Sequence, residues 1–207
     1  MREMATILIA TSNQGKLRDF AAAAVEHGIK VAGLPRFPTL LGVAEDQSSF
    51  EGNAAKKATY YSRFAPGAVL LADDSGLEVQ ALGGAPGVHS ARYAASSPQG
   101  NASDAANNAR LLHEMREVPD HQRQAQFVCV IVTARDGETL ASFRGEAQGT
   151  ILRSPRGSGG FGYDPLFFVP ALGKTFAELS PEEKARVSHR GQAFRKFLEW
   201  MEKGGSQ

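Results

Sequence analysis

The sequence has very little cysteine. Cys129 is the one cysteine among 207 residues, which excludes an internal disulfide and any metal cluster built on cysteine thiolates. Because Cys129 lies inside the apolar run at 127–132, we expect a thiol packed in the core rather than a nucleophile. The histidines also lack a metal-ligand spacing such as H-E-x-x-H. Any metal site therefore has to be built from oxygen ligands.

An excess of charge of either sign is absent as well. Lys and Arg together number 23 against 22 Asp and Glu, which gives a formal net charge of +1. Such a balance lacks the electrostatic footprint of a protein that binds duplex nucleic acid or an anionic membrane. We therefore expect neither nucleic acid nor a membrane as partner, and any positively charged site has to be local.

Long hydrophobic runs are missing too. The run "FVCVIV" at 127–132 is far shorter than the roughly 18 apolar residues of a membrane helix. The first sixteen residues turn polar after one strand-length apolar run, without the basic-then-apolar pattern of a signal peptide. We expect a cytoplasmic protein, and a hydrophobic content of 42% is ordinary for a globular chain with a core.

The patterns that are present predict a mixed α/β protein. Strands are expected at the short apolar runs 5–10, 68–73, 77–82, 125–135 and 139–152. Helices are expected within 13–28, 50–65 and 101–118, and again from a capping box at Ser180, Pro181 and Glu183. Asp136 and Gly137 predict a hairpin turn between the two long strands. Without repeats or linkers, we expect a single domain over 1–207 with two interleaved lobes and a cleft for a ligand.

Two adjacent carboxylates, Asp73 and Asp74, interrupt the apolar stretch 69–79. Burying even one carboxylate costs roughly several kcal/mol unless a cation or hydrogen-bond donors meet it. If the strand continues through both residues, their side chains face opposite sides and only one meets the cleft. Carboxylates with nearby basic groups suit Mg²⁺ bound together with substrate phosphates. An acid that caps a bend at 75–76 is the alternative explanation.

Two basic stretches are candidates for binding an anion. "ATSNQGK" at 10–16 joins the first strand to the first helix, where backbone N–H groups and the helix dipole favour an anion. It is not a Walker A loop, because Ala10 and Leu17 replace its first glycine and its hydroxyl residue. A simple polar cap is the alternative. Asn53 and Lys57 share a helix face, although a solvated charged helix would also explain that pair.

The stretch "RGSGGFGYDP" at 156–165 contains a formal G-x-G-x-x-G pattern. No helix pattern follows it, which excludes the dinucleotide fingerprint. A glycine loop that approaches a ligand remains, with a tight turn around a core aromatic as the alternative. Farther on, Lys184 and His189 would lie about 140° apart on one unbroken helix. Both can touch one ligand only if the helix breaks near Ser188, and a surface feature is the alternative explanation.

Taken together, these stretches resemble the inosine/xanthosine triphosphate pyrophosphatase family. The resemblance runs in order through "TSNQGK", "ADDSGLEVQALGGAPGVHSARYA", "GGFGYDPLFF" and "SHRGQA". It implies an elongated, two-lobed α/β fold with a mixed sheet flanked by helices and a central cleft, and a homodimer. It also implies Mg²⁺-dependent hydrolysis of non-canonical purine nucleoside triphosphates (ITP, dITP and XTP) to the monophosphate and pyrophosphate.

The resemblance also assigns residues. Asp74 resembles the proton acceptor and a metal ligand, and Glu45 resembles the second metal ligand, with Asp46 as the alternative. Substrate contacts are implied for Thr11, Ser12, Asn13, Gln14, Gly15, Lys16, Lys57 and Ser75, and on the nucleoside side for Phe161, Gly162, Tyr163, Asp164, Lys184, His189 and Arg190.

One departure and two rival functions stay open. The family often has an acid where this chain has Gly52, with Glu51 one residue earlier. A nucleotide-sensing or RNA-binding module without catalysis could use the same basic clusters, although the paired acids and the neutral net charge argue against it. A related pyrophosphatase for modified pyrimidine or canonical triphosphates is the closer rival.

Overall fold

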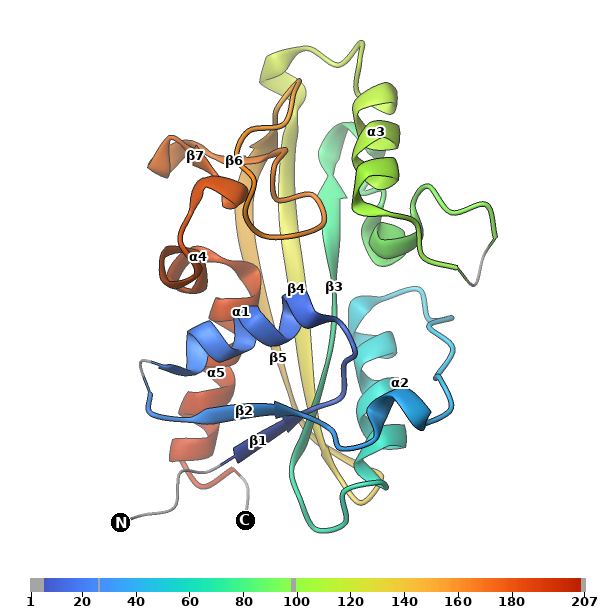
Figure 1. Ribbon diagram of the computed structural model, residues 1–207, viewed down its shortest axis with the longest axis vertical. Helices are drawn as coiled ribbons and strands as arrows, with labels where there is room; N and C mark the ends of the chain where they lie inside the picture. Colours follow the sequence, from blue (N-terminus) through green and yellow to red (C-terminus); the bar gives the residue numbers. More distant parts are fainter. Residues whose placement is uncertain (1–5, 26, 98–99, 206–207) are drawn as a thin grey trace. The chain divides into compact units, whose positions relative to one another are not determined.

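The computed structural model describes residues 6–25, 27–97 and 100–205, and the strands among them form one mixed sheet (Figure 1). The strand order is β2-β1-β3-β4-β5-β6-β7. The strands are β1 Thr6–Ile9, β2 Lys30–Gly33, β3 Leu70–Val79, β4 Gln124–Arg135, β5 Glu138–Ile151, β6 Phe167–Val169 and β7 Lys174–Thr175. β1 pairs in parallel with β2 and β3, whereas β6 pairs antiparallel with β5 and β7. The expected α/β class with a mixed sheet is confirmed.

The helices begin where the sequence offers hydroxyl or amide caps. They are α1 Gln14–Val25, α2 Phe50–Ser62, α3 Asp104–Glu114, α4 Pro181–Val187 and α5 His189–Glu202. The side chains of Ser49, Ser103 and Ser188 accept backbone N–H groups in the first turns of α2, α3 and α5. Short 3₁₀ turns cover Phe37–Thr39, Gln80–Leu82, Gly87–Arg92, Asp120–Gln122, Pro170–Leu172 and Phe176–Glu178. Across the described residues, each helix is too short or too polar to span a bilayer.

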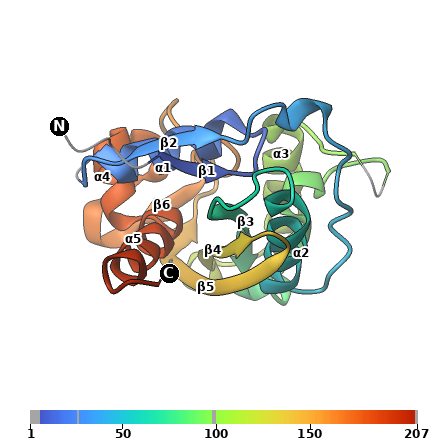
Figure 2. The same ribbon diagram turned by 90° about the horizontal axis from the view of Figure 1, so that it is seen from below.

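The chain folds into two compact units. The first comprises Met1–Asp74, Cys129–Gly145 and Ala185–Gln207, and the second comprises Ser75–Val128 and Glu146–Lys184. In the first unit α1 and α5 pack against each other (Figure 2), and the rings of Phe20 and Phe194 lie 5.6 Å apart. Its core cluster contains Ile7, Ile9, Phe20, Ala23, Ala24, Leu71, Cys129, Ile131, Phe143, Ala185, Ala193, Phe194, Phe197 and Leu198.

The second unit is built around aromatic rings and the inner face of α3. The ring centroids of Phe127, Phe167 and Phe176 lie 4.7 to 5.7 Å apart, distances typical of favourable aromatic pairs. Leu111 and Met115 of the α3 segment are fully buried. This packing provides a rigid support for the loops of the second unit.

Most local predictions are confirmed. Ser180 and Glu183 form the reciprocal capping box, with distances of 2.8 and 3.1 Å between backbone nitrogens and side-chain oxygens. The hairpin turn has positive φ at Asp136 and Gly137, as its sequence requires. The helix break at Ser188 is also present, because α4 ends at Val187 and α5 begins at His189.

Other predictions need correction. The runs 68–73 and 77–82 are not separate strands, because β3 continues from Leu70 to Val79, and Gln80–Leu82 is a 3₁₀ turn. There is accordingly no bend at 75–76 for an acid to cap. Short β2, β6 and β7 had no predicted counterpart. Of the expected strand 5–10, residue 5 lies outside the described residues, as does residue 26 of the first predicted helix.

Gly145 lies where β5 comes close to α5, so a substitution there tests this packing. A Cβ atom at this position would overlap the carbonyl oxygen of His189 and lie 2.5 Å from the amide nitrogen of Ala193. We expect Gly145→Ala to lower the free energy of unfolding by about 1 to 3 kcal/mol in urea titrations, because backbone atoms cannot move aside cheaply. The control Gly42→Ala, which points into open space, should change it by less than about 0.5 kcal/mol. Equal effects of the two variants would contradict this packing.

Candidate active site

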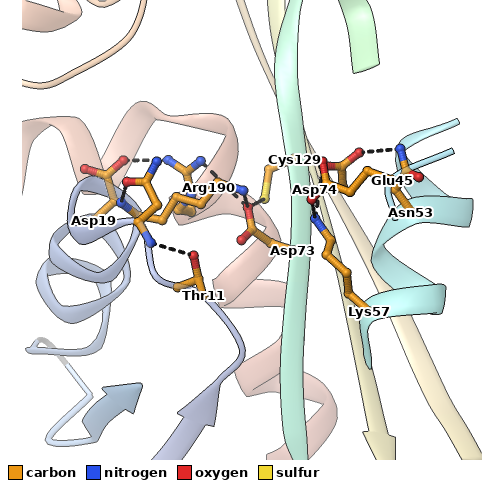
Figure 3. A network of polar contacts seen from close by, with 11 residues as sticks. Thr11, Asp19, Glu45, Asn53, Lys57, Asp73, Asp74, Cys129 and Arg190 are labelled. Carbon is orange, nitrogen blue, oxygen red and sulfur yellow. Dashed lines mark hydrogen bonds and ion pairs between the residues drawn. The ribbon is translucent and has the colours of Figure 1, made fainter. Parts of the chain in front are cut away.

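The two acids of β3 point to opposite sides of the strand (Figure 3). α1 and α5 lie on the side of Asp73, and α2 lies on the side of Asp74. Successive side chains of a strand alternate in this way, and the prediction for a continuing strand is confirmed. Both carboxylates are buried, with side chains 1% and 7% exposed, so each needs its own compensating charge.

Asp73 is compensated by cations from two helices. The Nζ atom of Lys16 in α1 lies 2.9 Å from Oδ2 of Asp73, and Nη2 of Arg190 in α5 lies 3.8 Å from the same oxygen. Arg190 also donates from Nη1 to Oδ2 of Asp19, at 2.6 Å. Lys16 and Asp19 are three residues apart and share one face of α1. The result is a buried network that ties α1, α5 and β3 together.

Two side chains of α2 bind the carboxylate of Asp74. Its Oδ1 accepts a hydrogen bond from Nζ of Lys57 and its Oδ2 accepts one from Nδ2 of Asn53, both at 3.2 Å. Asn53 and Lys57 are four residues apart, so the predicted shared face of this helix is confirmed. The same Lys57 ammonium donates to Oε1 of Glu45, at 2.7 Å. Lys57 therefore lies between two carboxylates.

These surroundings separate the pKa values of the two neighbouring acids. Burial alone would raise the pKa of Asp73, but the charges of Lys16 and Arg190 outweigh it and hold that pKa at about 2. Burial raises the pKa of Asp74 above its ordinary value, and the charges of Lys57 and Lys16 offset only part of that rise. Opposed shifts in neighbouring carboxylates are typical of acid–base sites. Asp73 suits a fixed anion, and Asp74 suits a group that takes up a proton.

The loop before α1 carries the predicted cap. Oδ1 of Asn13 accepts the N–H of Lys16 at 3.0 Å, and Oγ1 of Thr11 accepts the N–H of Asn13 at 3.1 Å. The alternative of a polar cap is therefore correct for Asn13, which accepts an N–H of α1, whereas Thr11 accepts the N–H of the residue that precedes the helix. Ser12 completes the loop, and Gln14 and Gly15 are the first residues of α1, whose first turn also carries Lys16 and its pair with Asp73. A helix N-terminus with an adjacent lysine favours an anion.

The structure separates Glu45 from Asp46. Glu45 joins the Lys57 and Asp74 group, whereas Asp46 pairs with Lys56 at the surface, at 2.8 Å. Glu51 pairs with Arg144 and brings no acid to this group. A side chain at Gly52 would collide with Cβ of Gln47, 2.8 Å away, so the local packing requires the glycine.

Asp74 and Glu45 form a donor set that fits a divalent cation. Oxygens of both carboxylates bind the ammonium group of Lys57. Mg²⁺ typically takes one or two carboxylates and completes its shell with water and substrate phosphates. Within the described residues, no group of three or more His, Cys, Asp or Glu side chains could hold a metal ion. Cys129 is buried as predicted, and burial raises the pKa of its thiol to about 12.

A second cluster lies in the second unit. Lys184 of α4 donates from Nζ to Oδ2 of Asp164, at 2.6 Å, and the same oxygen accepts the N–H of Phe161, at 2.9 Å. The Lys184 ammonium lies 5.0 Å from the centre of the Phe161 ring, within cation–π range. Tyr163 is buried and donates its hydroxyl to the carbonyl of Ser90, at 2.8 Å. The cluster combines a half-exposed aromatic ring with a buried ion pair.

The predicted nucleoside-side residues are thus divided. Phe161, Gly162, Tyr163, Asp164 and Lys184 belong to the second unit, whereas His189 and Arg190 belong to the first. The guanidinium of Arg190 lies with Asp19 and Asp73, and His189 is 3% exposed. Ser75 follows Asp74 in β3 and is half-buried. Sequence reasoning missed Asp19, for which only its spacing of three residues from Lys16 was a signal.

Comparison with known proteins gives a consistent result. Residues 7–200 match the model of the Ham1 family. The chain is 49% identical over 199 residues to a dITP/XTP pyrophosphatase of Geobacillus kaustophilus, covering 96% of this chain and 95% of that protein. It is 50% identical over 190 residues to a dITP/XTP pyrophosphatase of Geobacter sulfurreducens, covering 92% and 93%.

Solved structures show the same similarity. The Ham1 protein of Staphylococcus aureus has a TM-score of 0.80 at 42% identity, with 96% of this chain and 99% of that chain covered. A HAM1 protein of Coxiella burnetii has a TM-score of 0.81 at 37% identity, covering 97% and 100%.

The depressed pKa of Asp73 predicts a component of acid stability. Because its folded pKa of about 2 lies below the ordinary 3.8, the ionised carboxylate stabilises the fold above about pH 4. That stability is lost as the pH falls towards 2 and amounts to about 2 kcal/mol. Urea titrations between pH 5 and pH 2 should therefore show a shallower loss for Asp73→Asn than for the parent protein.

The exposed acid Asp46 provides the control for this measurement. Its pair with Lys56 is screened by solvent, so Asp46→Asn should follow the pH dependence of the parent protein. An Asp73→Asn variant that loses stability as steeply as the parent would contradict the buried pairing of Asp73 with Lys16.

Proposed function

Because the chain belongs to the Ham1 family, we propose that it hydrolyses non-canonical purine nucleoside triphosphates such as ITP, dITP and XTP. The products are the nucleoside monophosphate and pyrophosphate. The observation that carries the proposal is the pair of neighbouring acids with opposed pKa shifts, each matched to a lysine. Relatives named dITP/XTP pyrophosphatase, about half identical over nearly the whole chain, support the substrate class.

The lysines would receive the triphosphate. A nucleoside triphosphate carries about four negative charges near neutral pH, and cations in a partly buried site stabilise charge far better than water does. Lys16 and Lys57 already lie against carboxylates, so they are oriented before a substrate arrives. Phosphate oxygens would share these ammonium groups with the acids, while N–H groups at the start of α1 supply further donors.

Asp74 would act as the general base. In this scheme a water molecule attacks the α-phosphorus, its proton passes to Oδ of Asp74, and the α–β phosphoanhydride bond breaks to release pyrophosphate. A carboxylate with a raised pKa retains a proton better than an ordinary aspartate does. The direction of the Asp74 shift therefore favours Asp74 over Asp73 for this role.

Glu45 and Asp74 would hold Mg²⁺, whose fit to this donor set is described above. When bound, the ion would neutralise phosphate charge and activate water. Lys57, whose ammonium binds both carboxylates, would also bind the substrate phosphates. Asn53 would keep Asp74 oriented through its hydrogen bond to Oδ2.

The second cluster would receive the base. Phe161 offers a ring for stacking, and the Lys184–Asp164 pair lies beside it. Hypoxanthine and xanthine present a 6-oxo acceptor and a protonated N1, and adenine reverses both. Protein groups that pair with hypoxanthine or xanthine would be left without hydrogen bonds by adenine. Unpaired buried polar groups cost binding free energy, so adenine nucleotides would be rejected.

A substrate panel tests the proposed function. With Mg²⁺, the protein should release pyrophosphate from ITP, dITP or XTP with a kcat/KM at least about a hundredfold above that for ATP. Pyrophosphate and inorganic phosphate are measured separately. Release of single phosphate, or equal rates on ATP, would contradict the proposal, and a preference for modified pyrimidine triphosphates would favour the closer rival enzyme.

The role of Asp74 is tested by substitution. Asp74→Asn should lower kcat by about 10² to 10⁴, while circular dichroism and the urea midpoint show that the fold is retained. The matched control is Asp46→Asn, which removes an exposed acid and should leave kcat within about twofold. Activity of Asp74→Asn within tenfold of the parent would assign the base elsewhere.

The metal assignment separates Glu45 from Asp46. Glu45→Gln should raise the Mg²⁺ concentration for half-maximal rate by about tenfold or more, since a neutral amide is a poor ligand for this ion. Asp46→Asn should leave that concentration unchanged, and the reverse result would make Asp46 the metal ligand in place of Glu45.

The homodimer implied by the resemblance stays a prediction that light scattering would test.

A further inference from the structure

We infer that Asp104 and Asn108 of α3 form a clamp on Gly162 that holds the Phe161 ring in place for a nucleobase. The two side chains contact both polar groups of one residue. Oδ2 of Asp104 accepts the N–H of Gly162 at 2.7 Å, and Nδ2 of Asn108 donates to its carbonyl oxygen at 2.9 Å. The inference deepens the proposed function, on which it rests, by adding positioning residues for the base.

The need for such a clamp follows from the residues around Phe161. Its neighbours are Gly160 and Gly162, with φ of +72° and +61°. Glycine populates many conformations in a free chain and loses more entropy than any other residue when it is fixed. A ring carried between two glycines therefore keeps a single orientation only if other groups hold the backbone on both sides.

The structure holds each side differently. Before the ring, Asp164 accepts the N–H of Phe161 at 2.9 Å. A Cβ atom at Gly160 would collide with the Asp164 carboxylate, so this side of the loop is packed closely. After the ring, Asp104 accepts the N–H of Gly162 and Asn108 donates to its carbonyl oxygen. The clamp thus completes the support of the half-exposed ring.

Neither clamp side chain is the cap of α3, although Asp104 also lies in its first turn, where a negative charge is favourable. The cap of this helix is Ser103, whose hydroxyl oxygen accepts the N–H of Ala106 at 3.2 Å. The neighbouring Asn107 has the structural role, because it binds backbone groups of Ala91 and Ala94. Asn108 instead leaves its Oδ1 buried with no hydrogen-bond partner among the described residues. A buried oxygen without a hydrogen bond is costly. The orientation of the Asn108 amide that leaves Oδ1 unpaired is the one in which Nδ2 binds the carbonyl oxygen of Gly162.

The experiment combines steady-state kinetics with hydrogen exchange. KM and kcat for ITP are measured with Mg²⁺ for four variants, together with deuterium uptake of peptides that cover 157–164. Asn108→Ala should raise KM about tenfold. Asp104→Ala should raise it only about threefold, because the hydrogen bond of Asp104 is more exposed to water than that of Asn108. In both variants kcat should stay within about twofold, and uptake in 157–164 should increase.

Two further variants serve as matched controls. Asp104→Asn keeps an oxygen that can accept the Gly162 N–H, so it should restore KM and uptake to near the parent values. Ser103→Ala removes the cap of the same helix while leaving both clamp bonds intact, so it should change neither KM nor the uptake of 157–164. The first control isolates the hydrogen bond from the charge, and the second isolates the clamp from the stability of α3.

The outcomes are distinct. Unchanged uptake in Asn108→Ala would show that there is no clamp, and increased uptake with an unchanged KM would show that the clamp does not position the base. A rise in KM for Ser103→Ala equal to that for Asn108→Ala would assign the effect to helix stability. If the parent protein releases no pyrophosphate from ITP, the proposed function fails. The affinity for inosine monophosphate by calorimetry then replaces KM, and an affinity that Asn108→Ala leaves unchanged would overturn the clamp.

Discussion

Two carboxylates next to each other in a buried strand can both stay ionised only if each face of the strand supplies a cation or hydrogen-bond donors. This requirement determines much of the first unit. Helices α1 and α5 bring Lys16 and Arg190 to Asp73, and α2 brings Lys57 to Asp74 on the other side of β3 (Figure 3). An unpaired charge in such a place would cost several kcal/mol, roughly. The positions of these helices therefore determine whether the charges of the two acids are compensated.

The two faces of β3 compensate their acids to different extents, and the pKa values of the two acids differ as a result. Asp73 is held by two cations, one of which is itself held by Asp19. Asp74 shares the ammonium of Lys57 with Glu45. The more strongly compensated acid stays ionised, and the less compensated acid has the raised pKa. A single strand thereby carries, side by side, a carboxylate that stays ionised and one whose pKa is raised, as paired acids in catalytic sites commonly do.

The sequence predicts the features that depend on residues close together in the chain, and it does not predict contacts between residues far apart in the chain. The alternation of Asp73 and Asp74, the shared face of Asn53 and Lys57, and the helix break at Ser188 follow from the geometry of strands, helices and caps. The pair of Arg190 with Asp19 joins residues 171 positions apart, and nothing local announces it. The expected break in β3 failed because acids and a glycine normally mark turns, whereas here buried cations allow the strand to continue.

The two clusters also differ in how they are held rigid, and this bears on how activity and selectivity depend on the chain. Around Asp74 the support is ionic, through side chains on helices, so loss of one charge disturbs the others. Around Phe161 the support is a set of hydrogen bonds to the backbone of a glycine-rich loop. Such bonds do not alter the charge that phosphates encounter. If the proposed function holds, changes in the loop would adjust base selection and preserve the hydrolytic chemistry, because the loop would hold the stacking ring and the acids would act on water.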